Sequence, residues 1–99
     1  MKILEWTLQV TDMQILPMPV GAKLLAVQTF GNLPQLWALV DEGIAWTQRC
    51  FRTYKTGNPM PDEGCQGVYV GTYQIESEAQ AFHVFETPLP LCSAPVGET

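Results

Sequence analysis

Short segments of alternating apolar and polar side chains dominate this chain from its first residues. Between residues 4 and 11, polar residues alternate with the apolar side chains of Leu4, Trp6, Leu8 and Val10. A period of two places neighbouring side chains on opposite faces of a strand, whereas a helix would need apolar residues three and four apart. The chain also holds eight glycines and eight prolines in 99 residues, which indicates many turns rather than long helices. This pattern favours a sheet protein.

Turn residues divide the next part of the chain into three more predicted strands. Pro17 and Pro19 cannot donate backbone hydrogen bonds, so a strand between residues 11 and 21 should lie at a sheet edge. Residues 23–30 are apolar on both faces, which predicts a central strand. Gly31 and Asn32 then form a two-residue connection, because glycine can adopt the positive φ of a type II′ turn.

The strand that follows, LPQLWALVD at residues 33–41, is apolar on both faces. Leu36, Ala38 and Val40 share one face, and Trp37 and Leu39 share the other. Large contiguous apolar patches seldom stay exposed on soluble proteins. We therefore expect a second layer to cover each face and Trp37 to belong to the core.

The second half of the chain predicts one long strand and a final hairpin. In the strand at residues 45–56, the side chains on one face are expected to be Trp46, Gln48, Cys50, Arg52 and Tyr54. Neither face is fully apolar, so part of this strand should meet solvent. Residues 57–67 form a long loop with one helical turn expected near Asp62. Strands at 68–76 and 79–86 form a hairpin around Ser77, with Gly71 marking a bulge or a close backbone approach.

Together these segments predict an all-β fold, a small antiparallel β-sandwich or barrel-like sheet of six to seven short strands with little helix. Residues 1–86 form a single domain. Residues 87–99 are rich in proline and lack periodicity, which predicts a flexible tail.

Charge and cysteine content argue against several classes of function. The net charge is −5 with only five cationic residues, so direct, sequence-independent binding of nucleic acid is not expected. No apolar stretch approaches the length of a membrane span. Cys50, Cys65 and Cys92 are an odd number without a paired spacing, which favours reduced thiols in a cytoplasm and predicts neither a disulfide framework nor a metal site. We expect Cys50 to be a small core residue.

No residue pattern predicts catalysis or a cofactor. His83 is the sole histidine, and no nucleophile with an orienting acid accompanies it, so a half-buried, hydrogen-bonded strand histidine is expected. The acid pairs at 41–42 and 62–63 lie in turn sequences, where carboxylates usually cap and solvate the backbone. The sequence therefore predicts no enzyme, no cofactor and no metal.

One cluster could form a face that binds a partner: Trp46, Arg49, Arg52 and Tyr54. Arginines beside aromatic residues on a partly exposed strand suit planar stacking and bidentate contacts with carboxylate or phosphate groups. The alternative is structural, with the arginines paired across strands to Glu5, Glu76 or Glu86.

A series of short motifs resembles a group of small bacteriophage and prophage proteins that are conserved domains of unknown function. The motifs lie between residues 4 and 86 and include EWTLQVTD, MPVGAKLLAVQ, LWALVD, RCFR, TGNPM, YVGTYQI and FHVFE. The resemblance implies a phage accessory protein in the host bacterial cytoplasm. The leading hypothesis is a non-enzymatic protein that binds a host protein or ribonucleoprotein complex, inhibiting a defence system by steric blockade in the manner of an anti-CRISPR.

Two other functions and one assembly state stay open. Arg49 and Arg52 could hold a nucleotide signal in a protein that sequesters it. Alternatively, the protein could be a virion or assembly component. The partly polar surface around residues 46–55 could also close a homodimer.

Overall fold

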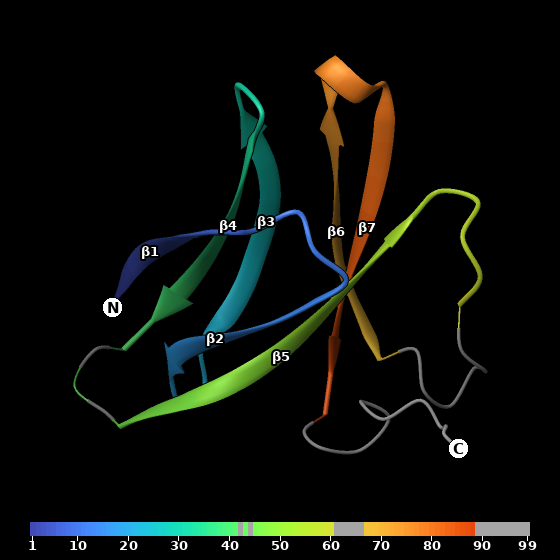
Figure 1. The fold of residues 1–99 in the computed structure, drawn as a ribbon. Coiled ribbons are helices and arrows are strands. Elements are labelled where there is room, and N and C mark those ends of the chain that lie inside the picture. Colours follow the sequence, from blue (N-terminus) through green and yellow to red (C-terminus); the bar gives the residue numbers. More distant parts are fainter. Residues whose placement is uncertain (42, 44, 61–66, 89–99) are drawn as a thin grey trace.

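A computed structural model describes residues 1–41, 43, 45–60 and 67–88. In these residues the chain forms seven strands, arranged in two antiparallel sheets (Figure 1). The strands are β1 (Lys2–Thr7), β2 (Met13–Pro19), β3 (Lys23–Phe30), β4 (Leu33–Val40), β5 (Trp46–Lys55), β6 (Val68–Ile75) and β7 (Gln80–Thr87). The predicted all-β sandwich is confirmed.

Sheet A contains three strands in the order β1-β4-β3. The hairpin between β3 and β4 has the predicted connection, with Gly31 at a φ of +62° and Asn32 outside the positive-φ region. The prediction that residues 23–30 form a central strand is wrong, because β4 occupies the middle of the sheet and β3 its edge. β3 is apolar on both faces for a different reason: Leu24 and Val27 face the core, while Leu25 and Phe30 lie exposed on the outer face.

The prediction that both faces of β4 are covered is also wrong. Leu36, Ala38 and Val40 are almost fully buried between the sheets. Trp37 and Leu39 lie on the opposite, outer face of sheet A and are only half-buried. Trp37 is therefore not a core residue, because the sandwich has two layers and the second sheet covers only one side of β4.

Sheet B contains four strands in the order β2-β5-β7-β6. β2 lies at the edge, as its two prolines predict, and pairs with β5 from Met13 to Pro19. β5 is the long strand that crosses the front of the molecule in Figure 1, and its partly exposed character is confirmed by the exposed side chains at both of its ends.

The core fills the space between the sheets with side chains from both layers. It contains Leu8, Met18, Ala22, Val27, Leu36, Ala38, Val40, Phe51, Tyr73, Ile75, Phe82 and Val84. Cys50 is buried, as expected, with an exposed fraction of 1%, but it lies outside this cluster.

The two sheets meet closely where β3 packs against β6. The β6–β7 register shifts between Tyr69 and Gly71, and a Cβ atom at Gly71 would lie 3.1 Å from Val27 Cβ. The predicted bulge and the predicted close approach are therefore both present, and the close neighbour belongs to the other sheet. At the far edges, Trp6 Nε1 of β1 donates to the Pro17 carbonyl of β2 at 2.9 Å.

The remaining connections agree with the predicted turn chemistry where the structure describes them. A short 3₁₀ turn, η2 (Glu76–Glu78), links β6 to β7 around Ser77. The Asp41 carboxylate accepts the Gly43 amide at 3.2 Å, which confirms a capping role for this acid. The predicted helical turn near Asp62 and the predicted tail from residue 89 onward lie outside the described residues.

Candidate functional site

The structure divides the predicted cluster of Trp46, Arg49, Arg52 and Tyr54 between the two faces of β5. Alternation along the strand places Trp46, Arg52 and Tyr54 on the outer face of sheet B. Trp46 is exposed near the start of the strand, at a distance from the other two along its length. Arg49 lies on the opposite face, toward the interior of the sandwich.

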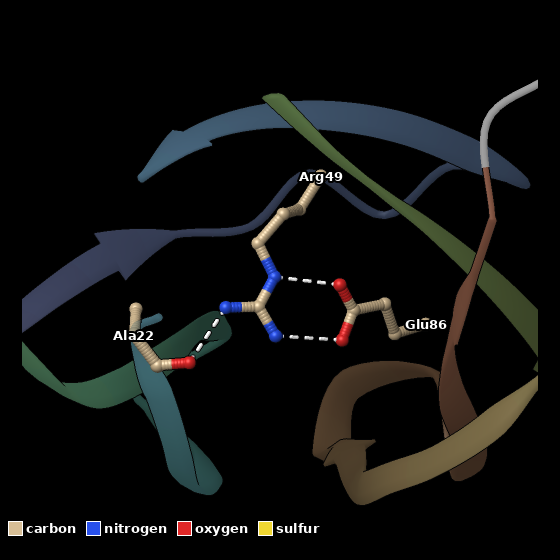
Figure 2. A network of polar contacts seen from close by, with 3 residues as sticks. All are labelled: Ala22, Arg49 and Glu86. Carbon is tan, nitrogen blue, oxygen red and sulfur yellow. Dashed lines mark hydrogen bonds and ion pairs between the residues drawn. The ribbon is translucent and has the colours of Figure 1, made fainter. Parts of the chain in front are cut away.

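Arg49 is held by three hydrogen bonds (Figure 2). Its Nε and Nη2 atoms donate to the two carboxylate oxygens of Glu86 at 2.6 and 2.7 Å, and Nη1 donates to the Ala22 carbonyl at 2.6 Å. The hydrogen bond from Arg49 to Glu86 raises the pKa of the guanidinium, burial lowers it, and the negative charge of Glu86 raises it further. The cross-strand pairing with Glu86 considered as the structural alternative is therefore the observed role of Arg49.

A row of side chains crosses all four strands on the outer face of sheet B. The register pairs Met13 with Arg52, Arg52 with Phe85, and Phe85 with Tyr69. We call these four residues the aromatic row. Met13 and Tyr69 at its ends are exposed by 41% and 56%, whereas Arg52 and Phe85 between them are half-buried. The row is thus a surface feature that tertiary pairing assembles from distant parts of the chain.

Aromatic contacts hold this row in a defined shape. The Phe85 ring meets the Tyr69 ring edge-on at a centroid distance of 5.5 Å, and it meets Tyr54 in the same manner at 5.9 Å. Edge-to-face pairs at these distances are favourable beyond the area they bury. Tyr54 therefore extends the row along β5 on the same face, where it pairs with His83, and the three rings form one preorganised aromatic surface.

A chain of hydroxyl groups and an imidazole runs beside the aromatic row. Tyr69 Oη lies 2.5 Å from Thr72 Oγ1, which lies 3.0 Å from His83 Nδ1. His83 Nε2 lies 2.7 Å from Thr56 Oγ1. Both ring nitrogens of the half-buried His83 are thus engaged by threonine hydroxyls, as expected for a hydrogen-bonded strand histidine. These contacts fix the Tyr69 hydroxyl at the surface.

A small cavity of about 190 Å³ opens next to Arg52 and Tyr54. It is lined by Asp12, Arg52, Thr53, Tyr54, Asn58 and Pro59. Among the described residues, the buried Tyr54 hydroxyl has no hydrogen-bond partner. The cavity is smaller than the roughly 300–1,000 Å³ typical of sites for drug-sized ligands, and its size suits a single inserted side chain.

The described residues offer few groups for other kinds of site. Across the ranges that the structure covers, no three His, Cys, Asp or Glu side chains are grouped so that they could hold a metal ion. In the same ranges, no helix has the length and apolar character needed to cross a membrane.

Sequence reasoning identified Arg52, Tyr54 and Trp46 but missed Met13, Tyr69 and Phe85. These three side chains come from β2, β6 and β7, and their place beside Arg52 depends on strand order and register. An alternating pattern shows that Phe85 and Tyr69 lie on one face of a hairpin, but it does not show which strand lies next to that hairpin.

Comparison with known protein families places the whole described fold in one family. A model of a domain of unknown function, DUF7352, matches residues 1–91. The chain belongs to the DUF7352 family. Comparisons with curated proteins and with solved structures give no significant match. The expected membership in a family of unknown function is confirmed, and function must be argued from the surface of this DUF7352 domain.

Proposed function

We propose that this DUF7352 protein is a non-enzymatic binding protein that contacts a macromolecular partner through the aromatic row. The observation that carries the proposal is the alignment of Met13, Arg52, Phe85 and Tyr69 across four strands, with Tyr54 packed against Phe85 on the same face. Aromatic residues, methionine and arginine are enriched in protein interfaces, and tyrosine and arginine are frequent among the residues that contribute most of the binding energy. A sheet also holds such side chains at fixed positions, which lowers the entropy cost of binding.

The charge of the chain favours a partner with a basic surface. The net charge of −5 would accelerate encounter with a positively charged patch, while the aromatic row would supply the short-range contacts. The resemblance to phage proteins supports a host protein or ribonucleoprotein complex in the bacterial cytoplasm as that partner. Blockade of a defence complex with a basic nucleic-acid groove fits both features.

A nucleotide-binding role is less favoured on the observed geometry. That alternative relied on Arg49 and Arg52 acting together, but Arg49 lies on the opposite face of β5 and is bound to Glu86. The cavity beside Arg52 and Tyr54 is also small for a nucleotide.

The proposal is tested by capture from bacterial lysate with immobilised wild-type protein and two variants. In the first variant, Tyr69→Glu places a charge at the exposed end of the aromatic row. The second, Ser77→Glu, adds the same charge on the exposed turn between β6 and β7, away from the aromatic row. We expect a stoichiometric partner on the wild type and on Ser77→Glu, with at least about tenfold less on Tyr69→Glu.

Two results would count against this proposal. Absence of any stoichiometric partner would remove the binding role, and equal recovery on all three proteins would move the contact surface away from the aromatic row. Circular dichroism of both variants checks that the added charge leaves the sheet fold unchanged.

A further inference from the structure

The outer face of sheet A carries a second apolar surface, on the side of the sandwich opposite the aromatic row. Its exposed side chains include Ile3, Leu25 and Phe30, with exposed fractions of 60%, 45% and 58%. Trp37 and Leu39 lie between them, half-buried, on the central strand. The outer face of an antiparallel sheet is usually polar where it meets water, so a surface of this composition indicates an interaction site.

The strand register shows how this surface is organised. One row joins Ile3, Leu39 and Lys23, and the next joins Glu5, Trp37 and Ala26. The β-bulge between Leu24 and Ala26 adds Leu25 to the outer face beside Trp37.

An aromatic pair extends the surface along the β3–β4 hairpin. The Phe30 and Trp37 rings meet edge-on at a centroid distance of 5.6 Å. They lie on the same side of the sheet as Gln35, which is only 6% exposed and receives a hydrogen bond from Thr7. The surface is therefore an apolar platform crossed by one polar row, in which Gln35 pairs with Thr7 and Gln28 on the neighbouring strands. Gln35, at the centre of that row, already has a hydrogen-bond partner in Thr7.

Two opposite charges lie on this surface at either side of β4. Glu5 belongs to β1, where its carboxylate accepts a hydrogen bond from Trp37 Nε1 at 3.3 Å. Lys23 belongs to β3 and is exposed. Among the described residues, Lys23 has no ion-pair partner.

We propose that the outer face of sheet A binds the same face of a second copy of this chain. In a dimer with a two-fold axis running along β4, β1 of one copy lies over β3 of the other. Glu5 of one copy then lies over β3 of the other copy, one row along the strand from Lys23. The two-fold axis repeats this contact with the copies exchanged. Trp37 and Leu39 lie near the axis, where the apolar residues of both copies meet.

A second copy fits this face better than an unrelated protein because the surface is complementary to itself in charge. The same arrangement leaves the aromatic row on the far side of each sandwich, so the dimer would present two such rows. From standard strand dimensions the platform measures about 14 by 25 Å, so two copies would bury roughly 700 Å² in total, less than the roughly 1,000 Å² expected of a stable interface. We therefore expect a weak, reversible dimer with a dissociation constant on the order of 100 μM.

Sedimentation equilibrium across protein concentrations tests the proposal. The wild type should change from the 11.0 kDa monomer to twice that mass as concentration rises. Leu25→Glu, which forces a charge into the apolar platform twice per dimer, should weaken association at least about 100-fold. Because Leu25 is exposed in the monomer, this variant should fold normally.

A charge exchange provides the more specific test. Glu5→Lys and Lys23→Glu should each weaken the dimer about tenfold, while the two changes together should restore it to within about threefold of the wild type. Glu76→Lys and Lys55→Glu, which lie outside the platform, are the matched controls and should leave association unchanged.

Monomeric behaviour of the wild type up to about millimolar concentration would overturn the proposal. So would a dimer that Leu25→Glu does not weaken, or a charge exchange that fails to restore association. The outcome is separable from that for the aromatic row, because Tyr69→Glu should leave the dimer intact and Leu25→Glu should still capture the partner.

Discussion

The two sheets are joined in two chemically different ways. Where β3 meets β6, the junction is apolar and depends on size: Gly71 lies so close to Val27 that a single added carbon would meet it at 3.1 Å. Near the start of β3, the junction is polar and depends on charge: Arg49 binds Glu86 of its own sheet and the Ala22 carbonyl that leads into the other sheet. The apolar junction should be insensitive to pH and salt but sensitive to added side-chain volume. The polar junction should be sensitive to the loss of either charged partner.

Removal of the arginine should give the largest effect. Arg49→Met should lower the free energy of unfolding by about 2–3 kcal/mol, since it leaves the Glu86 carboxylate without its partner. The loss should stay below that of a fully buried pair, because the two side chains retain exposed fractions of 19% and 26%. Urea unfolding followed by tryptophan fluorescence measures the change.

The matched control for the clamp is Arg49→Lys. Lysine keeps the positive charge but lacks the planar fork that meets both Glu86 oxygens and Ala22 at once. It should recover about half of the loss. Equal stability of the methionine and lysine variants would show that charge contributes nothing at this junction.

At the steric junction, Gly71→Ala should destabilise the protein by about 1–2 kcal/mol. The added methyl group meets Val27 Cβ and Cγ2 at 3.1 Å, so Val27 must move by a few tenths of an ångström to accept it. Gly43→Ala is the control, since its added carbon would lie 3.5 Å from the nearest atom, an Asp41 oxygen. The control should stay within about 0.5 kcal/mol of the wild type.

A change of pH should affect Tyr73, which lies near the steric junction. Its ring stacks on that of Phe82 at a centroid distance of 5.2 Å. Burial, with a smaller contribution from the Glu78 charge, raises the pKa of Tyr73 from its ordinary value of 10.0 to about 12. The folded state therefore favours the neutral phenol. The stability that this preference supplies is complete below pH 10 and is lost as the pH rises toward 12.

Tyr73→Phe should remove that dependence. It should be nearly neutral or slightly stabilising at neutral pH, because the buried Tyr73 hydroxyl has no hydrogen-bond partner in the part of the chain that the structure describes. Between about pH 9 and about pH 11.5, the urea midpoint of unfolding should fall less for the variant than for the wild type. An identical fall in both proteins would assign the alkaline loss to other groups.

Local patterns were sufficient for the strands and their turns. The alternation in β1 and β5, the prolines of β2 and the glycines at 31 and 71 each act through backbone geometry within a few residues, so their consequences could be predicted from the chain alone. The same reasoning placed Arg49 on the opposite face of β5 from Arg52, and Glu86 was among the acids considered as its partner. Alternation and turns depend on short-range sterics, which sequence encodes directly, whereas the choice of Glu86 among the three acids depended on strand pairing.

Tertiary structure decided which faces are covered and which residues meet across strands. The apolar run of β4 predicted burial on both sides, but a two-layer sandwich covers one face only, and Trp37 remained on the outside. Likewise, the aromatic row exists because β2, β5, β7 and β6 pair in that order, which brings together residues from 13 to 85. Strand order and layer number depend on long-range contacts, and the alternation within a strand is the same whichever strand lies beside it.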